Sequence, residues 1–189
     1  MTVFTSTMSA AALALLLAIP QAGPEAFDLV GKVVGKGGNA ATGAITVPMV
    51  VQIDRFTPEH ERTKMTDGLK YGGYPGFLNK LREAPAAGSL EVAGEKFVIR
   101  WARDVPTDKG RTLTFVTDTP VFFVGAGKKD AKPTAGYEVA VLELTLDKTG
   151  KGTGRMAAAA RVKPGGETGV RIDVYADALV TLTATARAR

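Results

Sequence analysis

The stretch ITVPMVVQI, residues 45–53, decides the fold because its apolar side chains alternate with a period of two. That period places every second side chain on the same face of a β-strand. One face carries Ile45, Val47, Met49, Val51 and Ile53. Pro48 falls on the other face. Because proline has no N–H to donate, we expect this strand at a sheet edge or with a bulge at Pro48.

The same alternation recurs along most of the chain and predicts further strands. The segments with this pattern include 113–115, 140–146, 170–174 and 180–184. Glycine-rich stretches of the kind found in hairpin turns separate such segments, at 35–43, 147–152 and 163–169. About seven or eight short strands predict an all-β, mainly antiparallel fold, as a single barrel or sandwich.

One segment, at about 57–85, lacks the strand pattern and predicts a helical insertion. Thr57 is expected to cap the first helix, with Pro58 at the first helical position. The Gly72–Gly73 pair should end that helix, and Pro75 should open a second one with an apolar stripe at helical spacing. We expect this insertion to lie on a sheet face or across a barrel mouth.

The N-terminal residues 1–23 contain no charged side chain. Residues 10–19 form an apolar run that is too short to span a bilayer, which takes about 20 residues, and that suits the core of a secretory signal peptide. We interpret 1–23 as a signal peptide and 24–189 as one β-rich domain that is exported to the periplasm or the extracellular space. The chain has no cysteine, so disulfides do not contribute to its stability.

Counting reactive residues argues against most catalytic mechanisms. Beyond residue 23 the chain has one serine, Ser89, and one histidine, His60. Ser89 is not in a Gly-x-Ser-x-Gly turn, and a single histidine without cysteine gives no basis for a metal site. The stretch GKGTGRMAAAARV, residues 150–162, imitates a dinucleotide-binding turn, but a proline follows too soon for a full helix. We interpret it as a hairpin and a strand whose small side chains admit a closely packed helix, and we expect no cofactor.

A ligand site is expected where the helical insertion meets the sheet. Phe97, Ile99 and Trp101 alternate in one strand and are expected to point inward, with Arg100 on the outer face. An apolar pocket with a polar handle at this place would suit a small apolar or anionic ligand. The candidate ligand-binding residues are Tyr71, Tyr74, Phe77, Arg100, Trp101 and Arg103. The leading hypothesis is therefore an exported, non-catalytic binding or structural domain.

Two other functions remain open at this point. Any two of the 19 acidic residues could meet in a cleft and act as the paired carboxylates of a hydrolase. Alternatively, the net charge of +5 and the cations that gather late in the chain could form a basic rim that binds an anionic polymer or a membrane or cell-envelope surface. These cations are Lys128, Lys129, Lys132, Lys148, Lys151, Arg155, Arg161, Lys163, Arg187 and Arg189. Nucleic acid is not expected, because aromatic residues for base stacking are not interleaved with them.

Several stretches resemble a family of exported bacterial β-rich proteins of unassigned function. They are DGLKYGGYPGFLNKLREAPAAGSLEV (67–92), IRWARD (99–104), VTDTPVFF (116–123) and GKGTGRMAAAARVKPGG (150–166). The resemblance covers most of the chain after residue 23. It implies export and a single β-rich domain, and it assigns no catalytic residue.

Overall fold

A computed structural model describes residues 23–33, 45–121, 134–165, 170–175 and 179–187. The proposed signal peptide, apart from its last residue, and the cations at 128–132 lie outside this part of the chain. The described elements are β1 (Glu25–Val33), β2 (Ile45–Ile53), α1 (Glu59–Glu83), β3 (Gly88–Val92), β4 (Glu95–Thr107), β5 (Gly110–Thr117), β6 (Val139–Asp147), β7 (Lys151–Pro164), β8 (Val170–Val174) and β9 (Leu179–Ala186).

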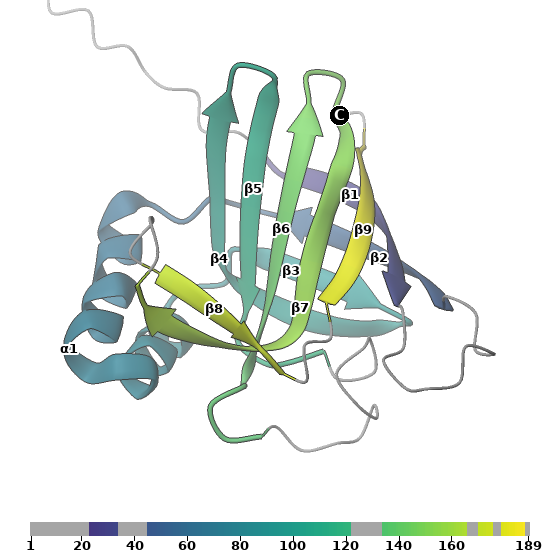
Figure 1. Ribbon diagram of the computed structural model, residues 1–189. Helices are drawn as coiled ribbons and strands as arrows, with labels where there is room; N and C mark the ends of the chain where they lie inside the picture. The colour runs from purple at the N-terminus through teal and green to yellow at the C-terminus, as the bar shows by residue number, and fades with distance from the viewer. Residues whose placement is uncertain (1–22, 34–44, 122–133, 166–169, 176–178, 188–189) are drawn as a thin grey trace, which may run out of the picture.

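The strands form an antiparallel sheet that closes on itself (Figure 1). Neighbouring strands follow the order β6-β5-β4-β3-β2-β1-β9-β7-β8, and β6 also pairs with β7. This last pairing joins eight strands into a barrel and leaves β8 outside the ring, paired with the end of β7. The predicted all-β fold with a helical insertion is therefore confirmed, and it is a barrel.

The interior of the barrel is filled with apolar side chains. All eight strands of the ring contribute buried residues, at alternate positions except at the irregularities in β4 and β7. The largest of them include Phe27, Leu29, Met49, Leu113 and Phe115. Phe27 and Phe115 meet across the barrel with their ring centroids 6.1 Å apart. A small barrel packed in this way has a solid core, so a ligand site is to be sought on its outside or at its ends.

Strand β2, which has the alternating pattern of residues 45–53, is not an edge strand. β2 pairs with β1 along its whole length, including Val30 with Pro48, and it also pairs with β3. The expectation of an edge or a bulge at Pro48 was wrong because closure of the barrel removes the edge. The pairing with β3 begins only at Met49, so the missing N–H of Pro48 falls just beyond that ladder.

Helix α1 consists of two helical halves joined by a sharp kink at Gly73, which has φ 61°. Positive φ values favour glycine, and Pro75 follows as the predicted start of the second half. The halves approach so closely that a Cβ on Gly76 would lie 2.4 Å from the carbonyl oxygen of Gly68. The predicted cap was wrong, because the N-cap position is Pro58 and no side chain caps the helix.

Helix α1 covers part of the outer surface of the barrel, beside β7 and β8 (Figure 1). Its buried residues meet outward-facing residues of β5, β6 and β7 in a second apolar cluster. On β7 these are Ala157, Ala160 and Val162, so small side chains do accept the helix as the alanine run predicted. Beneath α1, the barrel wall therefore carries apolar side chains on both its inner and its outer face.

Candidate functional site

A β-bulge in β4 sets up the site. Ile99 pairs with Thr117 and Trp101 pairs with Val116, so Arg100 is an extra residue between two consecutive pairs. The bulge reverses the alternation. Ile99 and Ala102 point into the barrel core, while Trp101 packs outward against the cluster under α1. The inward orientation predicted for Trp101 was therefore wrong, because a strict period of two does not survive an inserted residue.

The outer face of the barrel next to the helix carries two cross-strand rows of different character. Trp101 of β4, Val116 of β5 and Val141 of β6 are paired in one apolar row. The next outward-facing row is polar and consists of Arg103, Thr114, Glu143 and Arg155. The surface therefore changes from apolar to charged over two residues along each strand.

A groove of about 580 Å³ lies where α1 leaves this outer face uncovered. Such a volume is within the usual range of small-molecule sites. Leu69 and Phe77 come from the helix, and Val162 and Ile172 come from β7 and β8. Val105 and Ile172 line the groove with exposed fractions of 36% and 37%. Three walls, formed by the helix, the barrel and β8, thus enclose a partly apolar space that opens to solvent.

The charges in the groove are balanced except at one position. Arg62 donates to the carbonyl oxygen of Thr57 at 2.6 Å and forms an ion pair with Glu59. Glu143 forms an ion pair with Arg155 at 3.1 Å. Arg103 is exposed and makes no ion pair within the described ranges of the chain. Arg103 is therefore a cation, at the edge of an apolar surface, that has no anionic partner in the part of the chain that the structure describes.

Three of the predicted ligand-binding residues meet in this groove. Phe77, Trp101 and Arg103 all line it, although they come from two separate elements. Arg100 lies elsewhere, since the bulge directs its side chain to Asp118, at 2.8 Å, and to the carbonyl oxygen of Ala84, at 2.9 Å. Its polar groups are engaged in holding β4 to neighbouring segments.

The two predicted tyrosines do not line the groove. Tyr71 is 77% exposed on α1, with the Lys70 ammonium 5.1 Å from its ring centroid. Tyr74 is buried, and its hydroxyl accepts a hydrogen bond from the Glu138 N–H at 3.1 Å. Burial raises the pKa of Tyr74 far above its ordinary value. Tyr74 therefore attaches the second half of α1 to the start of β6.

Other groove residues were not anticipated, although the sequence carries a signal for some of them. Val116 and Val141 each adjoin a residue that points into the core, namely Phe115 and Leu142. Consecutive apolar residues in a strand indicate burial on both faces. In a barrel with a filled interior, such pairs mark the part of the outer wall that another element covers.

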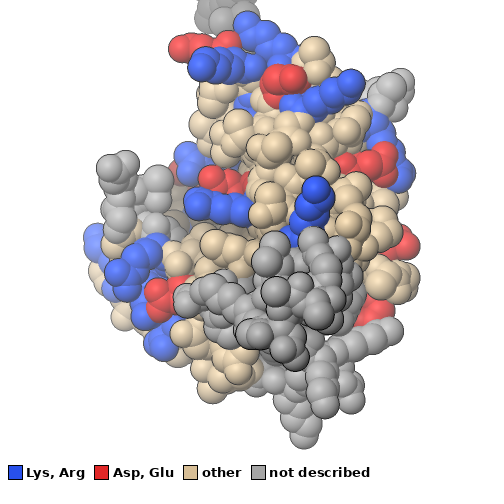
Figure 2. Space-filling view, turned by 45° about the vertical axis from the view of Figure 1, so that its right-hand side comes forward, with Lys and Arg blue, Asp and Glu red and all other residues tan. Residues whose placement is uncertain are grey.

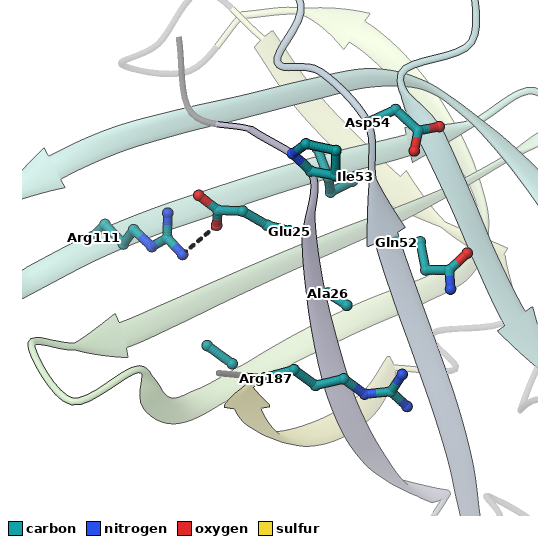
Figure 3. Close-up of a pocket in the computed structure, with 9 residues that line it drawn as sticks. Glu25, Ala26, Gln52, Ile53, Asp54, Arg111 and Arg187 are labelled. Atoms are coloured by element: carbon teal, nitrogen blue, oxygen red, sulfur yellow. Dashed lines mark hydrogen bonds and ion pairs between the residues drawn. The ribbon is translucent and has the colours of Figure 1, made fainter. Parts of the chain in front are cut away.

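A second pocket, also of about 580 Å³, lies at one end of the barrel (Figure 3). Arg111 donates to Glu25 at 2.6 Å and to Asp104 at 3.1 Å, and it lies over the Phe27 ring. Glu25 and Asp54 both line this pocket, which is where a paired-carboxylate hydrolase would have its acids. Glu25 is already paired with Arg111, which also contacts Asp104, so these three charges form an ion cluster at this end of the barrel.

The described cations of the expected basic rim are spread over the barrel. β7 has 14 residues, so Lys151 and Lys163 near its two ends are up to about 40 Å apart along the strand. Lys163 pairs with Asp173, and Arg187 pairs with Asp28 at 2.7 Å. At the end of the barrel where β4 turns into β5 and β6 turns into β7, Lys and Arg alternate with Asp and Glu (Figure 2). A single basic surface is therefore not assembled from the described residues.

The remaining candidate, His60, is an exposed residue in the first turn of α1. Its Nε2 lies 4.0 Å from Glu61, which already accepts two hydrogen bonds from Arg55.

Within the described residues no three acidic or histidine side chains come together as metal ligands would. No helix in the described part of the chain has the length and apolar character needed to cross a membrane.

No protein-family model, curated protein or solved structure matches this chain.

Proposed function

We propose that this chain is an exported, non-catalytic binding module whose ligand lies in the groove between α1 and the outer wall of the barrel. One observation carries the proposal, namely a groove of about 580 Å³ in which apolar side chains border a cation that has no partner among the described residues. Pockets that bind small molecules combine an apolar lining with a few polar groups in this way.

The contrast with the other cavity supports this choice. At the barrel end, Arg111 and Arg187 are neutralised by acids within the protein. In the groove, Val105 and Ile172 stay exposed to solvent. Exposed apolar surface that borders a concave site contributes binding energy when a ligand covers it.

The only tryptophan of the chain supplies a direct test, since Trp101 lines the groove. Titration with the amphipathic dye 1-anilinonaphthalene-8-sulfonate should enhance dye emission and quench Trp101 by energy transfer. Thr114 lies half-buried in the groove wall, and Thr114→Tyr should fill the space and weaken dye binding at least about tenfold.

Thr183→Tyr is the matched control, because Thr183 is an exposed threonine on β9 and does not line the groove. This variant should bind the dye as the unmodified chain does. Equal affinity in all three proteins would place dye binding elsewhere and overturn the proposed site. Circular dichroism of both variants establishes that the barrel is intact.

Export is a separate part of the proposal and rests on the uncharged, apolar segment 1–23. Alkaline phosphatase fused after residue 23 should be active in bacterial cells, because the enzyme gains its disulfides only outside the cytoplasm. A parallel fusion with two aspartates placed in the run 10–19 should be inactive. Activity of neither fusion, or of both, would argue against a signal peptide.

A further inference from the structure

The barrel wall of the groove carries an apolar row next to a polar row, and this arrangement indicates the chemical class of the ligand. This inference rests on the proposed binding function and narrows it to a chemical class. The apolar row of Trp101, Val116 and Val141 lies beside Leu69 and Phe77 of the helix. The polar row begins one outward position further along each strand. A ligand that follows the groove therefore passes from an apolar to a polar surface.

We propose that the groove binds a single-chain amphiphile with a carboxylate head, such as a long-chain fatty acid. The alkyl chain lies in the open part of the groove beside the helix, against Trp101 and Ile172. The carboxylate lies against Arg103 and Thr114, which are directly paired residues of β4 and β5. Cross-strand neighbours of this kind have Cβ atoms about 5 Å apart, which allows one carboxylate to contact both side chains.

The charges of the polar row favour an anion over a cation. Glu143 and Arg62, which also line the groove, are each paired with an oppositely charged side chain. Arg103 has no such partner among the described residues, and neither does the hydroxyl of Thr114. A guanidinium binds a carboxylate through two parallel hydrogen bonds, and a hydroxyl can donate a third.

An alkyl chain suits the rest of the groove better than a peptide does. The walls from β5 and β6 have a paired strand on each side, so their backbone N–H and C=O groups are already engaged with neighbouring strands. A peptide would bring its own backbone polar groups against this surface without partners there, and burying them is costly. An alkyl chain has no such groups, and it covers the exposed part of Ile172.

Three dodecyl compounds that differ in the head group test the inference at pH 8, with Trp101 emission and calorimetry as readouts. Dodecanoate should bind about three- to tenfold more tightly than dodecanol, because the head gains a charge-assisted contact that is partly screened by solvent. Dodecyltrimethylammonium should bind least. Shorter carboxylates should lose about fourfold in affinity for each methylene removed.

Two variants assign the preference to residues. Arg103→Gln should lower dodecanoate affinity to that of dodecanol and leave dodecanol binding unchanged. Glu143→Gln removes an acid from the same row and should strengthen dodecanoate binding about twofold. Lys96→Gln is the matched control, because Lys96 is an exposed cation of β4 outside the groove and its loss changes the net charge equally.

The outcomes separate this inference from the proposed function. If none of the three compounds binds, groove binding itself fails. If dodecanol and dodecanoate bind equally and Arg103→Gln changes neither, the groove is a binding site but the carboxylate is not recognised. If the ammonium compound binds most tightly, the charge argument is overturned. Equal effects of Arg103→Gln and Lys96→Gln would reduce the preference to net charge alone.

Discussion

Thr57 and Ala102 are joined by a reciprocal pair of hydrogen bonds across 45 residues of sequence. The Thr57 N–H donates to the Ala102 carbonyl oxygen at 2.8 Å, and the Thr57 hydroxyl accepts from the Ala102 N–H at 2.9 Å. Thr57 is only 1% exposed. The pair fixes the first residue of the helical insertion to β4, next to Trp101, which lines the groove.

Replacing Thr57 by valine should therefore destabilise the protein. Valine keeps the branched shape but leaves the buried Ala102 N–H without an acceptor, at a cost of about 1–3 kcal/mol. Thermal or urea unfolding measures this loss. Thr57→Ser keeps the hydroxyl and should retain most of the stability. If valine and serine have equal effects, the hydroxyl is not what holds this junction.

The close approach of the two halves of α1 predicts that Gly76→Ala is disruptive. The new Cβ would lie 2.4 Å from the Gly68 carbonyl oxygen, a backbone atom that cannot rotate away. We expect a loss of about 2 kcal/mol or more in the free energy of unfolding. Gly72→Ala is the control, since its Cβ would meet nothing within 4 Å. That substitution should be neutral or stabilise by up to about 1 kcal/mol, because alanine is the better helix former.

Arg111 holds together the acids at the barrel end, so Arg111→Met should destabilise by about 1–3 kcal/mol at neutral pH. The side chains of Glu25 and Asp104 are 10% and 25% exposed, and without the guanidinium both carboxylates lose their ion pair with Arg111. Lys109→Met, at an exposed position of the same hairpin, should change stability by less than about 0.5 kcal/mol.

Tyr74 should make the stability of the protein sensitive to alkaline pH. Burial raises the pKa of Tyr74 above its ordinary value of 10.0, so the folded state retains a proton that the unfolded chain releases. This contribution is fully present below pH 10 and is lost as the pH rises toward the folded-state pKa. Tyr74→Phe should cost about 1 kcal/mol at neutral pH, since the Glu138 N–H loses its acceptor.

The alkaline loss of stability should be smaller in Tyr74→Phe than in the unmodified chain when unfolding is measured between pH 8 and pH 11. Tyr71→Phe serves as the control, because this ring is 77% exposed. A Tyr71→Phe profile that flattens as much as that of Tyr74→Phe would show that burial of Tyr74 is not the cause.

The strands could be predicted from the sequence because each depends on a local pattern. The alternation at 45–53 or at 180–184 reports which side chains share a face, whatever strand lies next to them. The break in the helical segment was equally local, since Gly73 and Pro75 impose it on their own backbone. These features need no knowledge of distant residues.

The candidate site could be predicted only in part. Its location between the insertion and the sheet followed from where the alternation stops, and Phe77, Trp101 and Arg103 do line the groove. The bulge at Arg100 was missed because the extra residue shows only in the pairing of β4 with β5. Tyr74 was wrongly placed in the site for a similar reason. Its hydroxyl bonds to Glu138, which is 64 residues away in sequence, so the local pattern does not reveal this contact.

The sequence by itself determined the strands, the helical insertion and the small residues that accept it, because side-chain periodicity and backbone restrictions act over a few residues. Only the tertiary structure decided that the sheet closes through β6 and β7, that the interior is filled, and that a groove remains beside the helix. Closure and grooves depend on which distant side chains compete for the same space. The position of Trp101 outside the core, beside Arg103, which has no partner among the described residues, follows from that competition and from one inserted residue.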